Sequence, residues 1–180
     1  EVGGEDDALL AELLVVHRKR EDIEPIPSLL ERRVALAEVP EVRIGLLVEL
    51  AEVRANERKE PEEAVSSLRE ALEIDPSHGR AQSVLDALVR EAARQDSLAL
   101  LEDASELLLE SFRKANEPQK MPSILELRIG SVQDTYSKGE LLRQLCQLFA
   151  EELAQPKEAF ATQRRLVLLE PGSESSWDDL

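Results

Sequence analysis

The strongest constraint on the fold is an internal repeat with a period of 95 residues. When residues 1–85 are placed on residues 96–180 without a gap, 20 of the 85 positions are identical. The identities fall in clusters that keep the same register along both halves, such as Arg18 and Lys19 with their counterparts 95 residues later. Because the match crosses connections as well as regular segments, it indicates one structural unit present twice. We therefore expect a single domain over 1–180, with one unit at 1–95 and an incomplete second unit at 96–180.

Apolar residues within each unit recur every three or four positions, which is the spacing of one face of an α-helix. No stretch alternates between apolar and polar residues as a half-buried strand would. The pattern predicts helices near 6–19, 27–38, 41–58, 61–74, 79–94, 97–115, 122–133, 137–154 and 156–169, and a further helix from about Ser175. The connections are short, so consecutive helices are expected to be antiparallel. The expected fold is an all-α solenoid of helix hairpins, with about nine to ten helices.

Prolines mark the boundaries of the best-preserved helix in both copies. Pro61 and Pro156 suit a first helical turn, where a backbone N–H is not needed. Pro76 and Pro171 stand after the last turn, because proline forces the preceding residue out of helical geometry. These positions predict the start and the end of the same helix in each unit.

Composition and charge narrow the class of partner. Hydrophobic residues make up 42% and charged residues 33%, whereas aromatic residues make up 3%, so the core is expected to be aliphatic. The net charge is −16, and the densest basic stretch, 17–22, contains its own acids. Nucleic acid and anionic membrane surfaces are therefore disfavoured by repulsion. No run approaches the ~18 apolar residues of a membrane span. We expect a protein or peptide partner, with a basic one favoured by charge.

The stretch from 47 to 76 resembles a tetratricopeptide repeat (TPR). Leucines and an alanine in its first helix and small residues at fixed steps in its second helix carry the resemblance, and a proline closes the unit. The residues concerned are Leu47, Leu50, Ala51, Pro61, Ala64, Leu68, Ala71 and Pro76. The second copy, 142–171, keeps the pattern at Leu142, Leu145, Pro156, Ala159 and Pro171, and has Cys146 at the small-residue position. It departs at Gln163 and Leu166, where an apolar residue and an alanine are expected.

The resemblance implies a right-handed superhelix whose concave face binds another protein. The whole 95-residue unit looks like the long helical-repeat arrays of large bacterial proteins, and we expect this chain to be a piece of such an array. Both copies also have one residue more between their two helices than the commonest repeat. The matching positions do not supply the lysines and asparagines with which some relatives hold a terminal carboxylate. The expected binding stripe is instead neutral to acidic: Glu49, Glu52, Asn56, Gln144, Gln147 and Glu151.

Catalytic and metal sites are weakly indicated. Acid pairs at helical spacing are numerous, and solvated helix faces explain them better than a catalytic dyad. His17 and His78 have no second ligand at metal-binding spacing, and we expect His17 to be partly buried and His78 exposed. Cys146 is the only cysteine, which excludes an internal disulfide, and a small buried residue is favoured over a reactive thiol. Trp177 is expected to anchor the next helix. We expect no enzyme activity and no cofactor.

Two functions fit these observations. The favoured one is a non-catalytic scaffold that binds a partner on the inner surface formed by the helices at 41–58 and 137–154. The alternative is a helical arm that positions a catalytic domain lying outside this segment. Self-association through the ends of the array is a third possibility. A single cysteine is compatible with a reducing compartment, so we expect a cytoplasmic location.

Overall fold

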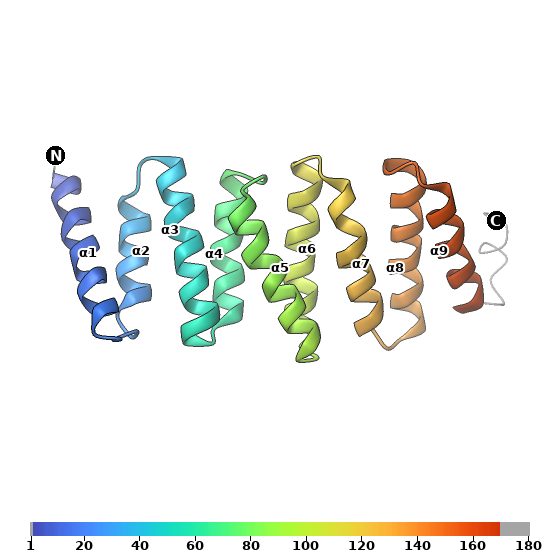
Figure 1. Cartoon of the computed structure of the whole chain (residues 1–180), viewed down its shortest axis with the longest axis horizontal. Coiled ribbons are helices and arrows are strands. Elements are labelled where there is room, and N and C mark those ends of the chain that lie inside the picture. The colour runs from blue at the N-terminus through green and yellow to red at the C-terminus, as the bar shows by residue number, and fades with distance from the viewer. Residues whose placement is uncertain (1, 170–180) are drawn as a thin grey trace. The chain divides into compact units, whose positions relative to one another are not determined.

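The computed structural model describes residues 2–169, and these residues form helices joined by short connections (Figure 1). The α-helices are α1 (Val2–Lys19), α2 (Ile26–Leu36), α3 (Pro40–Val53), α4 (Pro61–Ile74), α5 (Gly79–Arg94), α6 (Leu98–Lys114), α7 (Met121–Ser131), α8 (Thr135–Gln147) and α9 (Pro156–Leu169). Short turns are η1 (Arg54–Arg58), η2 (Pro118–Lys120) and η3 (Leu148–Glu152). The all-α prediction is confirmed. When η1 and η3 are counted with α3 and α8, the predicted boundaries lie within two residues of the observed ones except at the start of α1. Pro171, Ser175 and Trp177 lie outside the described residues.

The chain divides into two compact units. Unit 1 is Glu1–Leu88 and holds α1 to α4 with the first part of α5, and unit 2 is Val89–Leu180 and holds the rest of α5 with α6 to α9. The division falls close to the boundary of the sequence repeat at residue 95. Whether the units act as one domain, as expected from the sequence, stays a prediction.

The two units contain the same helices in the same order. Helices α2, α3 and α4 begin 95 residues before α7, α8 and α9, and α1 ends 95 residues before α6. Buried positions also correspond: the buried pairs include Leu30 with Leu125, Leu46 with Leu141, Leu50 with Leu145 and Val53 with Leu148. The sequence period is thus a structural period of five helices, α1 to α5, and the described part of the second copy contains the first four of them, α6 to α9.

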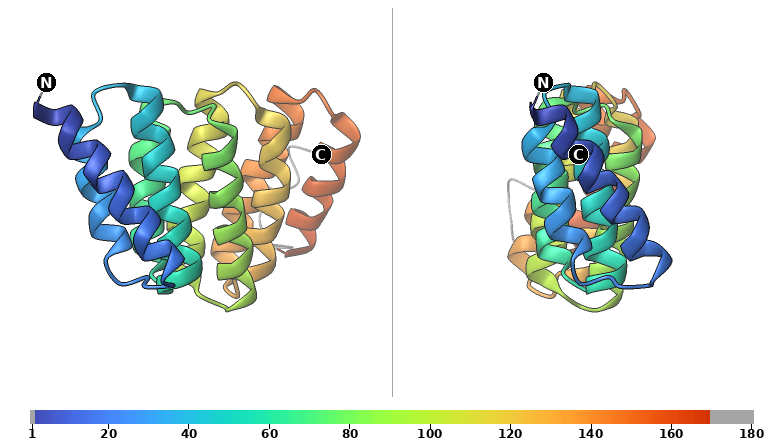
Figure 2. Two further views of the ribbon diagram at one scale, coloured as in Figure 1. Left: turned by 60° about the vertical axis from the view of Figure 1, so that its left-hand side comes forward. Right: turned by 90° about the vertical axis from the view of Figure 1, so that its left-hand side faces the viewer.

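Consecutive helices pack against each other in each unit. In unit 1, α2 packs against both α1 and α3, and α3 packs against α4. In unit 2, α7 packs against both α6 and α8, and α8 packs against α9. Within unit 1, α1 and α3 therefore share one row with α2 and α4 in the other, as the two views of Figure 2 show. Each unit by itself is a two-row stack of antiparallel helices.

The α3–α4 seam contains the residues that resemble a TPR. Leu47, Leu50 and Ala51 of α3 are buried, as are the three motif residues of α4, Ala64, Leu68 and Ala71. Small residues on both helices allow close approach, and leucines fill the remaining space. In the equivalent α8–α9 seam, Leu142, Leu145 and Ala159 are buried in the same way. Pro61 and Pro156 are the first residues of α4 and α9, as predicted.

The extra residue between the paired helices is accommodated by a π-helical turn in both units. η1 directly continues α3, and η3 directly continues α8. A π turn holds one residue more than an α turn, so it absorbs an inserted residue without unwinding the helix. A residue in left-handed conformation follows shortly after each turn, Lys59 with φ 60° and Ala154 with φ 52°. The predicted helices at 41–58 and 137–154 are therefore α-helices that end in a π turn.

Candidate functional site

The first half of the predicted stripe lies on one side of α3 and its π turn. Glu49 and Glu52 are half-buried on α3, and Asn56 is exposed in η1. Their spacings of three and four residues place them on the same face of the helix. These three residues therefore share one side of α3 and its π turn, and their role as a partner-binding stripe stays a prediction.

Arginines of neighbouring helices pair with both acids of this stripe. Arg18 at the end of α1 donates from Nη2 to Oε1 of Glu49 at 2.5 Å. Arg80 in the first turn of α5 donates to both carboxylate oxygens of Glu52, at 3.0 and 2.6 Å. The hydrogen bond to Glu52 raises the pKa of the Arg80 guanidinium. We call Arg18, Glu49, Glu52 and Arg80 the unit 1 ion-pair row.

The ion-pair row changes the electrostatics that the sequence suggests. The two carboxylates of α3 pair with one guanidinium group from α1 and one from α5, so the charges of these four side chains cancel. The arginines come from positions 31 and 28 residues away from their acids, and no local pattern connects them. Glu49 and Glu52 were identified from the sequence, but the two arginines that pair with them were not.

The second half of the stripe has a different chemistry. Gln144, Gln147 and Glu151 are exposed on α8 and η3, and the side-chain amide of Gln147 donates to Glu151 at 2.9 Å. Arg113 of α6 corresponds to Arg18, but it forms no ion pair within residues 2–169 because glutamine replaces the acid opposite it. That the stripes of α3 and α8 line one inner surface stays a prediction.

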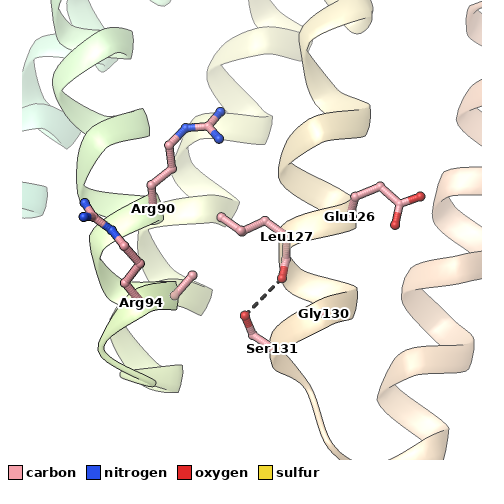
Figure 3. A pocket seen from close by; sticks show the side chains of 7 residues that line it. Arg90, Arg94, Glu126, Leu127, Gly130 and Ser131 are labelled. Atoms are coloured by element: carbon pink, nitrogen blue, oxygen red, sulfur yellow. Dashed lines mark hydrogen bonds between the residues drawn. The ribbon is translucent and has the colours of Figure 1, made fainter.

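Unit 2 also contains a groove that the sequence did not indicate. It has a volume of about 480 Å³ and lies between the end of α5 and α7, lined by Arg90, Ala93, Arg94, Glu126, Leu127, Gly130 and Ser131. Figure 3 shows the two arginines on the α5 side, and the Ser131 hydroxyl donating to the carbonyl oxygen of Leu127 at 3.0 Å on the α7 side. The groove is formed by residues far apart in sequence and by no recognisable motif.

The charged groups around this groove have partners of their own. Arg94 pairs with Glu91 one turn earlier, at 2.5 Å. Glu126 accepts two hydrogen bonds from Arg165 of α9, at 2.5 and 2.9 Å, and this contact raises the pKa of Arg165. The groove is therefore an open surface depression with satisfied charges, and its lining offers no catalytic pair.

One interhelical ion pair occurs at the same place in both units. Arg33 of α2 contacts both carboxylate oxygens of Asp7 on α1, at 2.6 and 3.1 Å. The positions 95 residues later are Arg128 and Glu102, whose charged atoms are 3.9 Å apart. The hydrogen bond from Arg33 lowers the pKa of Asp7. Because the pair joins adjacent helices in both units, its role is to orient the first helix hairpin of each unit.

The three residues considered for catalysis or metal binding have structural partners. His17 is half-buried as expected, and its Nδ1 lies 2.9 Å from a carboxylate oxygen of Asp22. His78 is half-buried rather than exposed, because its Nδ1 accepts a hydrogen bond from the backbone N–H of Ala81 at the start of α5. Cys146 is half-buried rather than fully buried, and its Sγ donates to the carbonyl oxygen of Ala159 at 3.5 Å.

Between residues 2 and 169, no three histidine, cysteine, aspartate or glutamate side chains come together as a metal-binding group. None of the helices described here combines the length and the apolar character that a membrane crossing requires.

Comparisons with known proteins give little guidance. No protein-family model matches the chain, and no curated protein matches it in sequence. The structure of BtubC (BKLC) from P. vanneervenii matches with a TM-score of 0.40 and 13% identity, over 92% of this chain and 81% of that chain. The structure of MamA protein matches with a TM-score of 0.43 and 13% identity, over 93% of each chain. Similarity at this level adds nothing to the fold described above and carries no function.

Proposed function

We propose that the chain is a non-catalytic interaction module of the TPR type, and that unit 1 binds a protein or peptide across α1, α3 and α5. The α3–α4 seam supports the TPR assignment, because its leucines and alanines are buried where that repeat requires close packing.

The unit 1 ion-pair row is the observation that carries this proposal. Arg18 and Arg80 are exposed, and the side chains of Glu49 and Glu52 are 33% and 30% exposed. Exposed ion pairs contribute ~0–1 kcal/mol to stability, so a partner can replace them at small cost. Basic side chains of a partner can take the carboxylates while its acidic groups or carbonyls take the freed arginines.

The expected partner is a segment that crosses three helices of one row. Binding across successive helices suits an extended or helical peptide, which presents side chains at regular intervals. The partner needs basic residues opposite Glu49 and Glu52, and complementary acceptors opposite Arg18 and Arg80. This requirement is more specific than a net positive charge, which would suit any acidic surface.

A charge reversal tests the proposed face. Immobilised wild-type chain, the double variant Glu49→Lys/Glu52→Lys and the control double variant Glu38→Lys/Glu73→Lys are used to capture proteins from the same extract, which are then identified by mass spectrometry. The control makes the same charge change at exposed positions off the ion-pair row. Circular dichroism confirms that all three are equally helical. We expect some proteins to be captured by the wild type and by the control but not by the Glu49→Lys/Glu52→Lys variant. Identical capture by all three would refute the proposal that this face binds a partner.

A further inference from the structure

Gly45 lies inside α3, at a position where the fold of unit 1 does not require a glycine. It is exposed, and a Cβ at this position would meet nothing within 4 Å beyond the backbone of its own helix. Its φ is not positive, so no turn or left-handed backbone calls for glycine there. Glycine is also less favourable than alanine inside a helix. The missing side chain therefore weakens α3 and leaves room for a molecule that approaches from outside.

Gly45 shares one side of α3 with the acids of the ion-pair row. It precedes Glu49 by four residues and Glu52 by seven, and Val42, which is 49% exposed, lies three residues before it. These spacings place the four residues along one side of the helix. We call Val42, Gly45, Glu49 and Glu52 the α3 face. Its first half is apolar with one side chain missing, and its second half is acidic.

The exposure of the α3 face does not depend on where the chain begins or ends. Within unit 1, α3 is an inner helix that packs against α2 and α4. The equivalent positions of α8 in unit 2 are also accessible, since Glu140 is half-buried and Gln144 and Gln147 are exposed. The face is therefore open in both copies of the repeat.

The length of the α3 face favours a helical partner over an extended one. Gly45 and Glu52 are seven residues apart, which corresponds to ~10.5 Å along α3. A partner helix that crosses α3 is ~10–12 Å wide with its side chains, so it covers both positions. An extended chain that crosses α3 covers about half this length, since neighbouring strands are only ~4.8 Å apart. A helix can thus contact the glycine and both acids at once.

A missing side chain also allows two helices to approach closely. The distance between the axes of packed helices is ~8–10 Å and depends on the side chains at the contact. At Gly45 a partner helix can place apolar side chains against the backbone of α3 and against Val42. Lysine or arginine side chains on the adjacent flank of the same partner then reach the carboxylates of Glu49 and Glu52. We propose that the partner of unit 1 is a basic amphipathic helix that crosses α3 at Gly45, an inference that rests on the function proposed above for this surface.

Selection from a displayed library of random peptides tests the helical partner. The peptides are about 15 residues long, the length at which an isolated helix becomes marginally stable. Binders of the immobilised wild-type chain are depleted on the Glu49→Lys/Glu52→Lys variant, so that only binders of the α3 face remain. We expect these to carry apolar residues at spacings of three and four with lysine or arginine beside them. Synthetic copies should gain helical circular dichroism when they bind.

A leucine at the glycine position tests where the partner crosses. Gly45→Leu is expected to weaken the selected peptides by about tenfold or more, because overpacking at a close contact carries a cost of this size. The matched control is Gly130→Leu in α7, where a Cβ likewise meets nothing within 4 Å, and it should bind as wild type does. Both variants should unfold in urea at or above the wild-type midpoint, because leucine favours a helix more than glycine does. Loss of binding by Gly45→Leu is then separate from loss of folding.

The outcomes distinguish this inference from the proposed function on which it rests. Peptides that require Glu49 and Glu52 but bind Gly45→Leu as tightly as wild type would overturn the helix crossing and leave the proposed function intact. Selected sequences with strand-like alternation or internal prolines would do the same. Equal weakening by Gly45→Leu and Gly130→Leu would also overturn the crossing. If depletion leaves no peptide, the proposed function fails and the inference fails with it.

Discussion

Removing one methyl group from Ala154 is expected to stabilise unit 2, whereas the same change in the middle of α9 should destabilise it. Ala154 has φ 52°, in the left-handed region that L-residues avoid, and it is exposed. That conformation costs a residue with a Cβ ~1–2 kcal/mol, and glycine adopts it freely. Glycine also gives the unfolded chain more freedom, which costs ~0.5–1 kcal/mol. The expected net gain for Ala154→Gly is therefore ~0.5–1 kcal/mol.

The matched change is Ala161→Gly, at an exposed position inside α9. Here the backbone is already helical, so glycine only adds unfolded-state freedom and the expected loss is ~1 kcal/mol. Urea unfolding of wild type and both variants, followed by far-ultraviolet circular dichroism, should show midpoints on opposite sides of wild type. The slopes should stay the same, because neither change alters the surface exposed on unfolding. Two midpoints shifted in the same direction would refute the argument from backbone conformation.

Two further predictions concern the core and the ion pair at α1. Leu68→Ala, at a fully buried position in the α3–α4 seam, is expected to lower the free energy of unfolding by ~2–5 kcal/mol. The control Leu168→Ala, at a position that is 78% exposed, should change it by less than ~0.5 kcal/mol. Equal effects of the two changes in urea unfolding would contradict the packing described for this seam. The hydrogen bond from Arg33 lowers the pKa of Asp7 in the folded state below its usual value of 3.8. The stability that the Asp7–Arg33 pair contributes is therefore fully present above pH 3.8, and it is lost as the pH falls through the folded-state pKa of Asp7. Asp7→Asn should lower the free energy of unfolding by under ~1 kcal/mol near neutral pH, because 40% of the Asp7 side chain is exposed to solvent. It should also flatten the dependence of stability on pH below 3.8, and an unchanged dependence would count against the pair.

The sequence predicted local structure well because local chemistry specifies it. Pro61 and Pro156 stand at the first positions of α4 and α9, where a missing N–H costs nothing. Positions that match in the gap-free repeat are also buried in both units, since Leu50 and Leu145 are both buried in equivalent seams. The extra residue between helices was visible in the sequence, but only the structure shows it as a π turn. An inserted residue can be absorbed by a π turn, a bulge or a longer loop, and packing chooses among them.

Predictions failed where the outcome depends on a neighbour in space. His78 was expected to be exposed because it follows a helix stop, yet its ring accepts a hydrogen bond from the first turn of α5. Cys146 occupies the position of the buried Ala51 but is itself half-buried. Equivalent repeat positions can therefore differ in burial.

The sequence alone determined the period, the helices, their order and the aliphatic seam within each unit. These follow from the 3.6-residue periodicity, proline geometry and the free energy of burying leucine and alanine, which all act within a few turns of helix. Tertiary structure decided the electrostatics of the surface. Arg18 and Arg80 reach Glu49 and Glu52 from positions 31 and 28 residues away, and they neutralise the two acids of the stripe. Side-chain pairing across helices depends on how the helices pack, and periodicity along one helix does not encode it.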